Sequence, residues 1–196
     1  MKRETLDRLA DSRAVRRPVV RLVWLDSGEE RIVASDETSA PVEGADLPAF
    51  LSEGIAAAIR SDRATLVESH EGPVFIHPIS PALRLAIVGA VHIAQRLATL
   101  AIDLGYDVTI IDPRRGFLTE QRFPGTTRSH EWPDAALEAF APDARSAVVT
   151  LSHDAKIDEP ALEVALRSPS FYVGALGSQR TQAKRRDRLR QADLSE

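Results

Sequence analysis

The sequence predicts an α/β protein in which a doubly wound, mostly parallel five-stranded sheet follows a small α+β module. From residue 83 onward, five short apolar segments alternate with amphipathic helical segments. This alternation is typical of a parallel sheet covered by helices on both faces. Before residue 81 the patterns are those of hairpins and short helices. We therefore expect two domains, over residues 1–80 and 83–196.

Composition excludes several classes of protein. A hydrophobic fraction of 43% and a charged fraction of 28% are ordinary for a globular protein, and a net charge of −4 gives no general attraction to nucleic acid. The absence of cysteine rules out disulfides, thiolate metal sites and cysteine nucleophiles. No two of the five histidines are spaced i, i+4, so no metal site is expected.

The N-terminus is charged and has no apolar run behind it. No stretch of the chain approaches the roughly 20 apolar residues of a membrane-spanning helix. We therefore expect neither a secretory signal nor a membrane span, and a cytoplasmic location, which the lack of cysteine fits.

The N-terminal module is predicted from local patterns alone. Its expected elements are a helix over residues 2–16, a hairpin of strands over 19–25 and 31–34, a helix over 47–60, and a second hairpin of strands over 65–68 and 74–77. Composition marks residues 35–48 as a loop and 78–81 as a linker. We expect this module to be too small for an extensive core of its own.

The C-terminal part contains the alternating elements. Strands are expected over residues 83–88, 107–111, 126–129, 146–151 and 171–175, and helices over 92–104, 133–140 and 158–166 and after Ser178. Asp158 is expected to cap the helix that begins with it. The helix over 92–104 has an apolar stripe that should pack on the sheet, formed by Ile93, Leu97, Leu100, Ala101 and Leu104. Gly105 follows, in the position where a left-handed residue commonly ends a helix.

The loop after the first of these strands is a candidate anion-binding turn, because ligands of doubly wound sheets bind beyond the carboxyl ends of the strands. Residues 89–94 there are Gly-Ala-Val-His-Ile-Ala. Val91 stands where a dinucleotide-binding, Rossmann-like turn has its second glycine, which disfavours ordinary NAD binding. The next helix N-terminus still offers N–H groups to an anion. Alternatively, Gly89 only makes a tight turn. If the loop binds a ligand, replacing Gly89 should weaken ligand binding more than it lowers the stability of the protein.

Asp112 follows the second strand, 23 positions after Gly89, where a Rossmann-like domain has its ribose-binding carboxylate. It equally fits an aspartate that starts a turn before Pro113. Arg114 and Arg115 come next, and they contact either phosphate or solvent.

Two later strand ends carry further candidates. After the fourth strand, His153 and Asp154 could orient an imidazole or hydrogen-bond a ligand, although a solvated loop explains them as well. After the fifth strand, Gly174, Gly177 and Ser178 form a glycine-spaced turn that ends in a good N-cap and could cradle a second anion. The basic helix that follows is either a solvated face or a surface for an anionic ligand or partner.

Four segments together resemble the XdhC/CoxF family, accessory proteins for molybdenum hydroxylases such as xanthine dehydrogenase and carbon monoxide dehydrogenase. They are residues 85–94 with Gly-Ala-Val-His, 108–114 with Asp-Pro-Arg, 150–154 with Ser-His-Asp, and 172–178 with Gly-Ala-Leu-Gly-Ser. The segments occur in the family's order, over roughly residues 83–189. The resemblance implies a maturation factor, or chaperone, that binds molybdopterin (the molybdenum cofactor) and delivers it to a hydroxylase apoenzyme.

The sequence departs from the family pattern at several places. Many members have glycine where this chain has Val91, and arginine where it has Gln179. The N-terminal module lacks the family's glycine- and cysteine-bearing stretch. Members also commonly continue past the last basic helix with a Gly-Pro-x-Gly-rich segment, and we expect this C-terminal end to be missing here.

The resemblance and the strand-end positions together imply nine cofactor-binding residues. They are Gly89, Ala90, His92, Asp112, His153, Asp154, Gly174, Gly177 and Ser178. We expect an accessory cofactor-binding protein more than an enzyme, with no catalytic or metal-binding residue. The implied partners are the hydroxylase apoenzyme and a sulfurtransferase, with a homodimer as the candidate assembly. The alternative is an NAD(P)-dependent oxidoreductase on the same fold, which Val91 and the lack of a Tyr-x-x-x-Lys pair disfavour.

Overall fold

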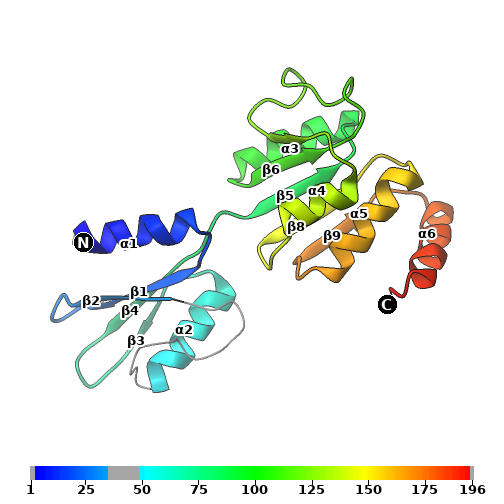
Figure 1. The fold of residues 1–196 in the computed structure, drawn as a ribbon. Helices are drawn as coiled ribbons and strands as arrows, with labels where there is room; N and C mark the ends of the chain where they lie inside the picture. The colour runs from blue at the N-terminus through cyan, green and yellow to red at the C-terminus, as the bar shows by residue number, and fades with distance from the viewer. Residues whose placement is uncertain (1–2, 35–48, 195–196) are drawn as a thin grey trace. The chain divides into compact units, whose positions relative to one another are not determined.

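The computed structural model describes residues 3–34 and 49–194. The chain divides into two compact units, Met1–Pro81 and Ala82–Glu196, and Figure 1 colours the second of them from green to red. Within the described residues, no helix has the length and apolar character needed to cross a membrane.

The N-terminal unit is a four-stranded antiparallel sheet with two helices. Its elements are α1 (Arg3–Ala14), β1 (Val19–Trp24), β2 (Glu30–Ala34), α2 (Ala49–Ser61), β3 (Thr65–Val67) and β4 (Val74–Ile79). Both predicted hairpins are confirmed, and the sheet order β2-β1-β4-β3 joins them through pairing of β1 with β4. The loop expected over residues 35–48 lies outside the described residues.

Two expectations about this unit are wrong. The expected linker over 78–81 begins too early, because β4 continues to Ile79 and Pro78 pairs with Val20 of β1. The proline is tolerated there because β3 pairs only with the first half of β4. The unit also has its own core, because joining the hairpins gives α2 a continuous sheet face to cover. The core residues are Val20, Leu22, Trp24, Val33, Leu51, Ile55, Ala58, Val74 and Ile76.

The C-terminal unit is a five-stranded, entirely parallel sheet of order β7-β6-β5-β8-β9. Its strands are β5 (Arg84–Val88), β6 (Asp107–Ile111), β7 (Thr127–Ser129), β8 (Ser146–Thr150) and β9 (Tyr172–Ala175). Its helices are α3 (His92–Asp103), α4 (Pro133–Phe140), α5 (Ala155–Arg167) and α6 (Gln179–Gln191). The predicted doubly wound parallel sheet is therefore confirmed. The strand order reverses between β5 and β8, and ligands of such sheets bind at that point.

The central strand β5 shows why the sheet needs cover on both faces. Leu85 and Ile87 belong to the core cluster under α3, whereas Ala86 and Val88 belong to the cluster under α4 and α5. Alternate residues of a strand point to opposite faces, so an almost continuously apolar strand is buried on both.

The predicted sheet-facing stripe of α3 is right only in part. Leu97 packs against the core cluster, and Ala101 is buried as expected. The buried residues of the helix are Ala94, Ala98 and Ala101, while Leu100 and Leu104 are exposed. The alanines have the same helical spacing as the leucines, and their small side chains let the helix lie close to the sheet. Gly105 has a φ of +84° and ends the helix as expected.

Helix α5 begins three residues earlier than expected. Asp154 is its N-cap, and the Asp154 carboxylate accepts a hydrogen bond from the Lys156 N–H at 3.0 Å. Asp158, which was expected to open the helix, therefore lies in its first turn and is buried. With the helix starting at this position, Asp158 does not cap the helix, and its buried carboxylate is free for other contacts.

Candidate functional site at the carboxyl ends of the strands

Gly89 forms the turn after β5 and faces the loop after β8. Its φ is +104°, and a Cβ at this position would lie 2.8 Å from the Ser152 backbone nitrogen. The Gly89 N–H donates to the Ile111 carbonyl at the end of β6, at 2.8 Å. Glycine is thus required both by the backbone conformation and by the close approach of a second strand end.

The start of α3 lies directly beyond this turn. Val91 is the N-cap residue and supplies no side-chain hydrogen bond to the helix, and His92, the first helical residue, is exposed. The first amide N–H groups of a helix carry a partial positive charge and can bind an anion. An apolar N-cap leaves these groups to a ligand or to water.

Asp112 fastens the loop after β5 to the end of β6. Its side chain is fully buried, and each carboxylate oxygen accepts two hydrogen bonds. The Ala90 N–H and Arg114 Nη2 donate to Oδ2 at 2.7 Å each, and the Arg114 backbone N–H and Nε donate to Oδ1 at 2.9 Å each. Four bonds fill the acceptor capacity of a carboxylate. The ribose-binding role expected for Asp112 stays a prediction.

These bonds set the protonation of Asp112. Burial alone would raise the pKa of Asp112, but the hydrogen bonds from Arg114 and Ala90 outweigh it and hold the pKa below the ordinary 3.8. The stability that the ionised group contributes is therefore present above about pH 4 and is lost as the pH falls through the lowered folded-state pKa.

We expect Asp112→Asn to destabilise the C-terminal unit at neutral pH, by about 1–3 kcal/mol, because buried donors lose a charged acceptor. Below about pH 4 the wild type should lose stability more steeply than the variant, because only the wild type has this proton to take up. Melting temperatures measured between about pH 2 and 7 check this. Parallel curves for the two proteins would contradict it.

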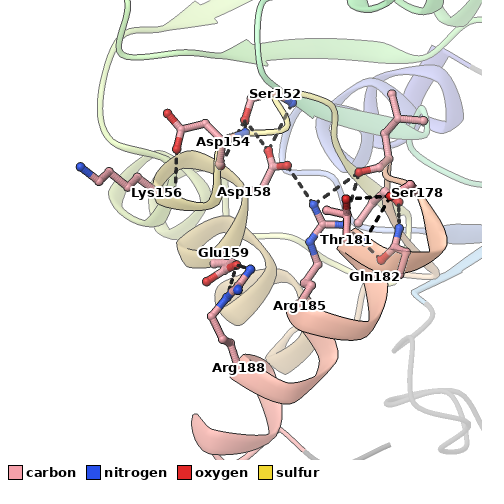
Figure 2. Close-up of polar contacts among 12 residues, drawn as sticks. Ser152, Asp154, Lys156, Asp158, Glu159, Ser178, Thr181, Gln182, Arg185 and Arg188 are labelled. Atoms are coloured by element: carbon pink, nitrogen blue, oxygen red, sulfur yellow. Dashed lines mark hydrogen bonds and ion pairs between the residues drawn. The ribbon is translucent and has the colours of Figure 1, made fainter.

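A buried ion pair connects the loops after β8 and β9. Figure 2 shows Arg185 pointing from α6 toward Asp158 of α5, and the Arg185 Nη2 to Asp158 Oδ2 distance is 3.1 Å. The side chains are 5% and 0% exposed. Asp158 Oδ1 also accepts from the Ser152 hydroxyl at 2.6 Å and from its N–H at 3.2 Å. Arg185 in turn donates to the Leu176 carbonyl, at 3.3 Å from Nη1.

Further contacts hold the start of α6 against the end of β9 (Figure 2). Gln182 Nε2 donates to the Ala175 carbonyl at 2.6 Å, and Arg185 Nη1 donates to Gln182 Oε1 at 3.1 Å. Ser178 is the N-cap, as expected, and its hydroxyl accepts from the Thr181 N–H at 3.2 Å. The loops after β5, β6, β8 and β9 are therefore joined by one continuous series of contacts.

The structure brings only some of the predicted site residues together. Gly89, Ala90 and Asp112 form one contact group. Gly177 lies beside Arg185, because a Cβ built at Gly177 would be 3.5 Å from Arg185 Nη1. His153 is exposed and has a φ of +62°. Gly174 lies within β9, where an added Cβ would meet the ring of its neighbour Tyr172.

Sequence reasoning missed Ser152, Asp158 and Arg185. Asp158 looked like a helix cap, and Arg185 was one of several arginines on a basic helix. A helical wheel of α6 could have singled out Arg185, because this residue shares a face with Gln182 and Leu189. That face is the less exposed side of the helix. In the described ranges, no three His, Asp or Glu side chains gather as a set of metal ligands.

A family model described as the XdhC Rossmann domain matches residues 85–196, which is more than half of the chain. The chain belongs to this family. The resemblance drawn from the motifs is confirmed, as is the Rossmann-like fold of the C-terminal unit.

Two relatives in sequence extend this finding. The molybdenum cofactor insertion chaperone PaoD of Escherichia coli (strain K12) is 33% identical over 115 residues, 59% of this chain and 30% of that protein. A probable subunit of xanthine dehydrogenase from Bacillus subtilis (strain 168) is 31% identical over 106 residues, 54% of this chain and 32% of that protein. The matches thus span about a third of the length of these two relatives.

A solved structure supports the fold of nearly the whole chain. It is a xanthine dehydrogenase from Bacillus halodurans, which superposes with a TM-score of 0.70 at 22% identity and covers 93% of this chain and 55% of that one. At this identity the likeness concerns the fold alone.

Proposed function

We propose that this XdhC-family chain binds molybdenum cofactor as a maturation factor and delivers it to a molybdenum hydroxylase such as xanthine dehydrogenase or carbon monoxide dehydrogenase. The observation that carries the proposal is the turn at Gly89, which opens onto the uncapped start of α3 where the strand order reverses. The name of the relative PaoD, a molybdenum cofactor insertion chaperone, supports the choice of ligand.

The residues present fit a phosphate-bearing cofactor. The first amide N–H groups of α3, from His92 onward, have no N-cap side chain in front of them. The N–H groups of the preceding turn, residues 89–91, already donate within the protein. Thr150, the last residue of β8, is buried and its hydroxyl has no partner among the described residues, so a polar group remains available at this strand end for a ligand or a water molecule. When bound, the cofactor would supply the redox chemistry of the client enzyme, while this chain would bind, shield and release it.

The alternative is an NAD(P)-dependent oxidoreductase, which the strand order allows. Two features disfavour it. Val91 has a side chain where a close approach of a pyrophosphate needs glycine. The carboxylate of Asp112 already accepts four hydrogen bonds within the protein, so a ribose hydroxyl would have to displace one of them.

Side-by-side titrations test the proposal. The full chain is titrated with purified molybdenum cofactor, NAD(H) and NADP(H), and binding is followed by pterin fluorescence or by calorimetry. We expect the molybdenum cofactor to bind at least about tenfold more tightly than either nicotinamide, a difference of about 1.4 kcal/mol. Tight nicotinamide binding without cofactor binding would contradict the proposal and favour the oxidoreductase.

A second experiment tests delivery. The chain loaded with molybdenum cofactor is mixed with cofactor-free xanthine dehydrogenase, and recovery of hydroxylase activity is compared with the recovery given by the same concentration of free cofactor. Faster or more complete recovery from the loaded chain is expected. Equal recovery would mean that the chain binds the cofactor without delivering it.

A further inference from the structure

The geometry points to Arg114 as the residue that binds a phosphoryl group of the ligand, through a guanidinium that the buried Asp112 carboxylate holds in place. The inference rests on the proposed function only for the identity of the whole ligand. The phosphoryl subsite can be tested without it.

The guanidinium of Arg114 is fixed on one edge and on one face. Nε and Nη2 donate to the two oxygens of Asp112 at 2.9 and 2.7 Å. The Phe117 ring lies under the guanidinium, with its centroid 4.6 Å from Cζ. The Ala90 N–H shares Oδ2 with Arg114 Nη2, so the guanidinium is tied to the turn after β5. An arginine held in this way loses little entropy when it binds a further group.

The opposite edge of the guanidinium is available. Arginine has five N–H donors, and the bonds to Asp112 use one from Nε and one from Nη2. Nη1 has no hydrogen-bond partner among the described residues, and the Arg114 side chain is 36% exposed. The Nη1 and remaining Nη2 hydrogens form a second fork, and such a fork matches two oxygens of a phosphoryl group.

The hydrogen-bonding groups at Arg114 favour a phosphoryl group, which only accepts, over a neutral hydroxyl, which also donates. The hydrogen bonds to Asp112, with lesser effects of Asp154 and Asp158, raise the pKa of Arg114, so the residue stays a cation. Of these acids, Asp112 is paired with Arg114 itself, Asp158 is paired with Arg185, and Asp154 caps the positive end of α5. A ribose hydroxyl would find no spare acceptor on Asp112, whereas a phosphoryl oxygen needs only donors.

The neighbouring Arg115 offers a matched control. It carries the same charge one residue further on and is exposed, so Arg115→Ala removes the same charge without touching the pair with Asp112. Arg114→Lys keeps the charge next to Asp112 but loses the fork, and Arg114→Ala removes both. Thermal melting of each variant establishes that it is folded; should Arg114→Ala fail to fold, Arg114→Lys carries the test.

The probe is inorganic pyrophosphate, measured by calorimetry on the full chain at fixed ionic strength. We expect Arg114→Ala to weaken pyrophosphate binding roughly tenfold to a hundredfold, the loss of one or two charge-assisted hydrogen bonds, and Arg114→Lys to weaken it several-fold. Arg115→Ala should bind within about twofold of wild type. Equal losses in the Arg114 and Arg115 variants, or no pyrophosphate binding by the wild type, would overturn the inference.

The molybdenum cofactor titration separates this inference from the proposed function. Cofactor binding that is unchanged in folded Arg114→Ala and Arg114→Lys variants would overturn the phosphoryl role and leave the proposed function standing. Binding of pyrophosphate that depends on Arg114, without any binding of the cofactor, would support the subsite and overturn the proposed function.

Discussion

Replacing Arg185 by alanine is expected to lower the free energy of unfolding of the C-terminal unit by about 3–5 kcal/mol, the usual cost of removing one partner of a buried ion pair. The carboxylate of Asp158 is fully buried, and without Arg185 it would keep only the two donors of Ser152. Urea unfolding, followed by circular dichroism, measures the change. The loop after β9 should also loosen, because Arg185 no longer holds the Leu176 carbonyl.

A second ion pair between the same two helices provides the control. Arg188 of α6 pairs with Glu159 of α5 at the surface, where its side chain is 45% exposed. Solvent screens such a pair, so Arg188→Ala should leave the urea midpoint close to that of the wild type. A double replacement of Asp158 and Arg185 by leucine should recover much of the loss, because no buried charge is then left unpaired. Similar small shifts for Arg185→Ala and Arg188→Ala would show that the buried pair does not fasten α6.

Replacing Gly89 by alanine is expected to impair both stability and ligand binding. The φ of +104° costs a non-glycine residue about 1–3 kcal/mol, and the new Cβ would overlap the Ser152 backbone, which lies 2.8 Å away. The overlap should push the loops after β5 and β8 apart. The expectation from sequence, that binding would suffer more than stability, left out this contact.

A Gly105→Ala variant separates the effect of backbone strain from the effect of the steric overlap. Its φ is +84°, but nothing lies within 4 Å of a Cβ built there, so Gly105→Ala introduces the backbone strain without an overlap. Melting temperatures and molybdenum cofactor titrations of both variants are compared. We expect Gly89→Ala to melt lower than Gly105→Ala and to be the one that loses cofactor binding. Equal melting temperatures and equal cofactor affinities would mean that Gly89 only makes a turn.

The sheet of the C-terminal unit was predictable because its evidence is local. Each strand is a short apolar run between breakers, and the alternation with helices fixes parallel pairing. The face of α3 was not predictable in the same way, because alanines and leucines both recur at helical spacing and only packing against the sheet decides between them. In the N-terminal unit, the pairing of β1 with β4 joins residues that lie between 50 (Trp24 and Val74) and 60 (Val19 and Ile79) positions apart, and hairpin patterns contain no information about it.

The candidate site, too, was predictable only where the evidence for it is local. Gly89 and Asp112 could be located because they directly follow strands, and strand ends form the ligand-binding edge. The link from Ser152 through Asp158 to Arg185 was missed because it depends on the first residue of α5 and on which face α6 turns inward. A shift of three residues in the start of α5 changes Asp158 from a helix cap into a buried acceptor.

The central claim is that the cofactor binds beyond the carboxyl ends of β5, β6 and β8. Amide hydrogen exchange of the full chain, with and without purified molybdenum cofactor, tests it most directly. We expect the cofactor to slow exchange at residues 89–94, 114–117 and 152–155, with little change on the outer face of α6 or in the N-terminal unit. Protection confined to α6 or to the N-terminal unit, with these three segments unchanged, would contradict the account.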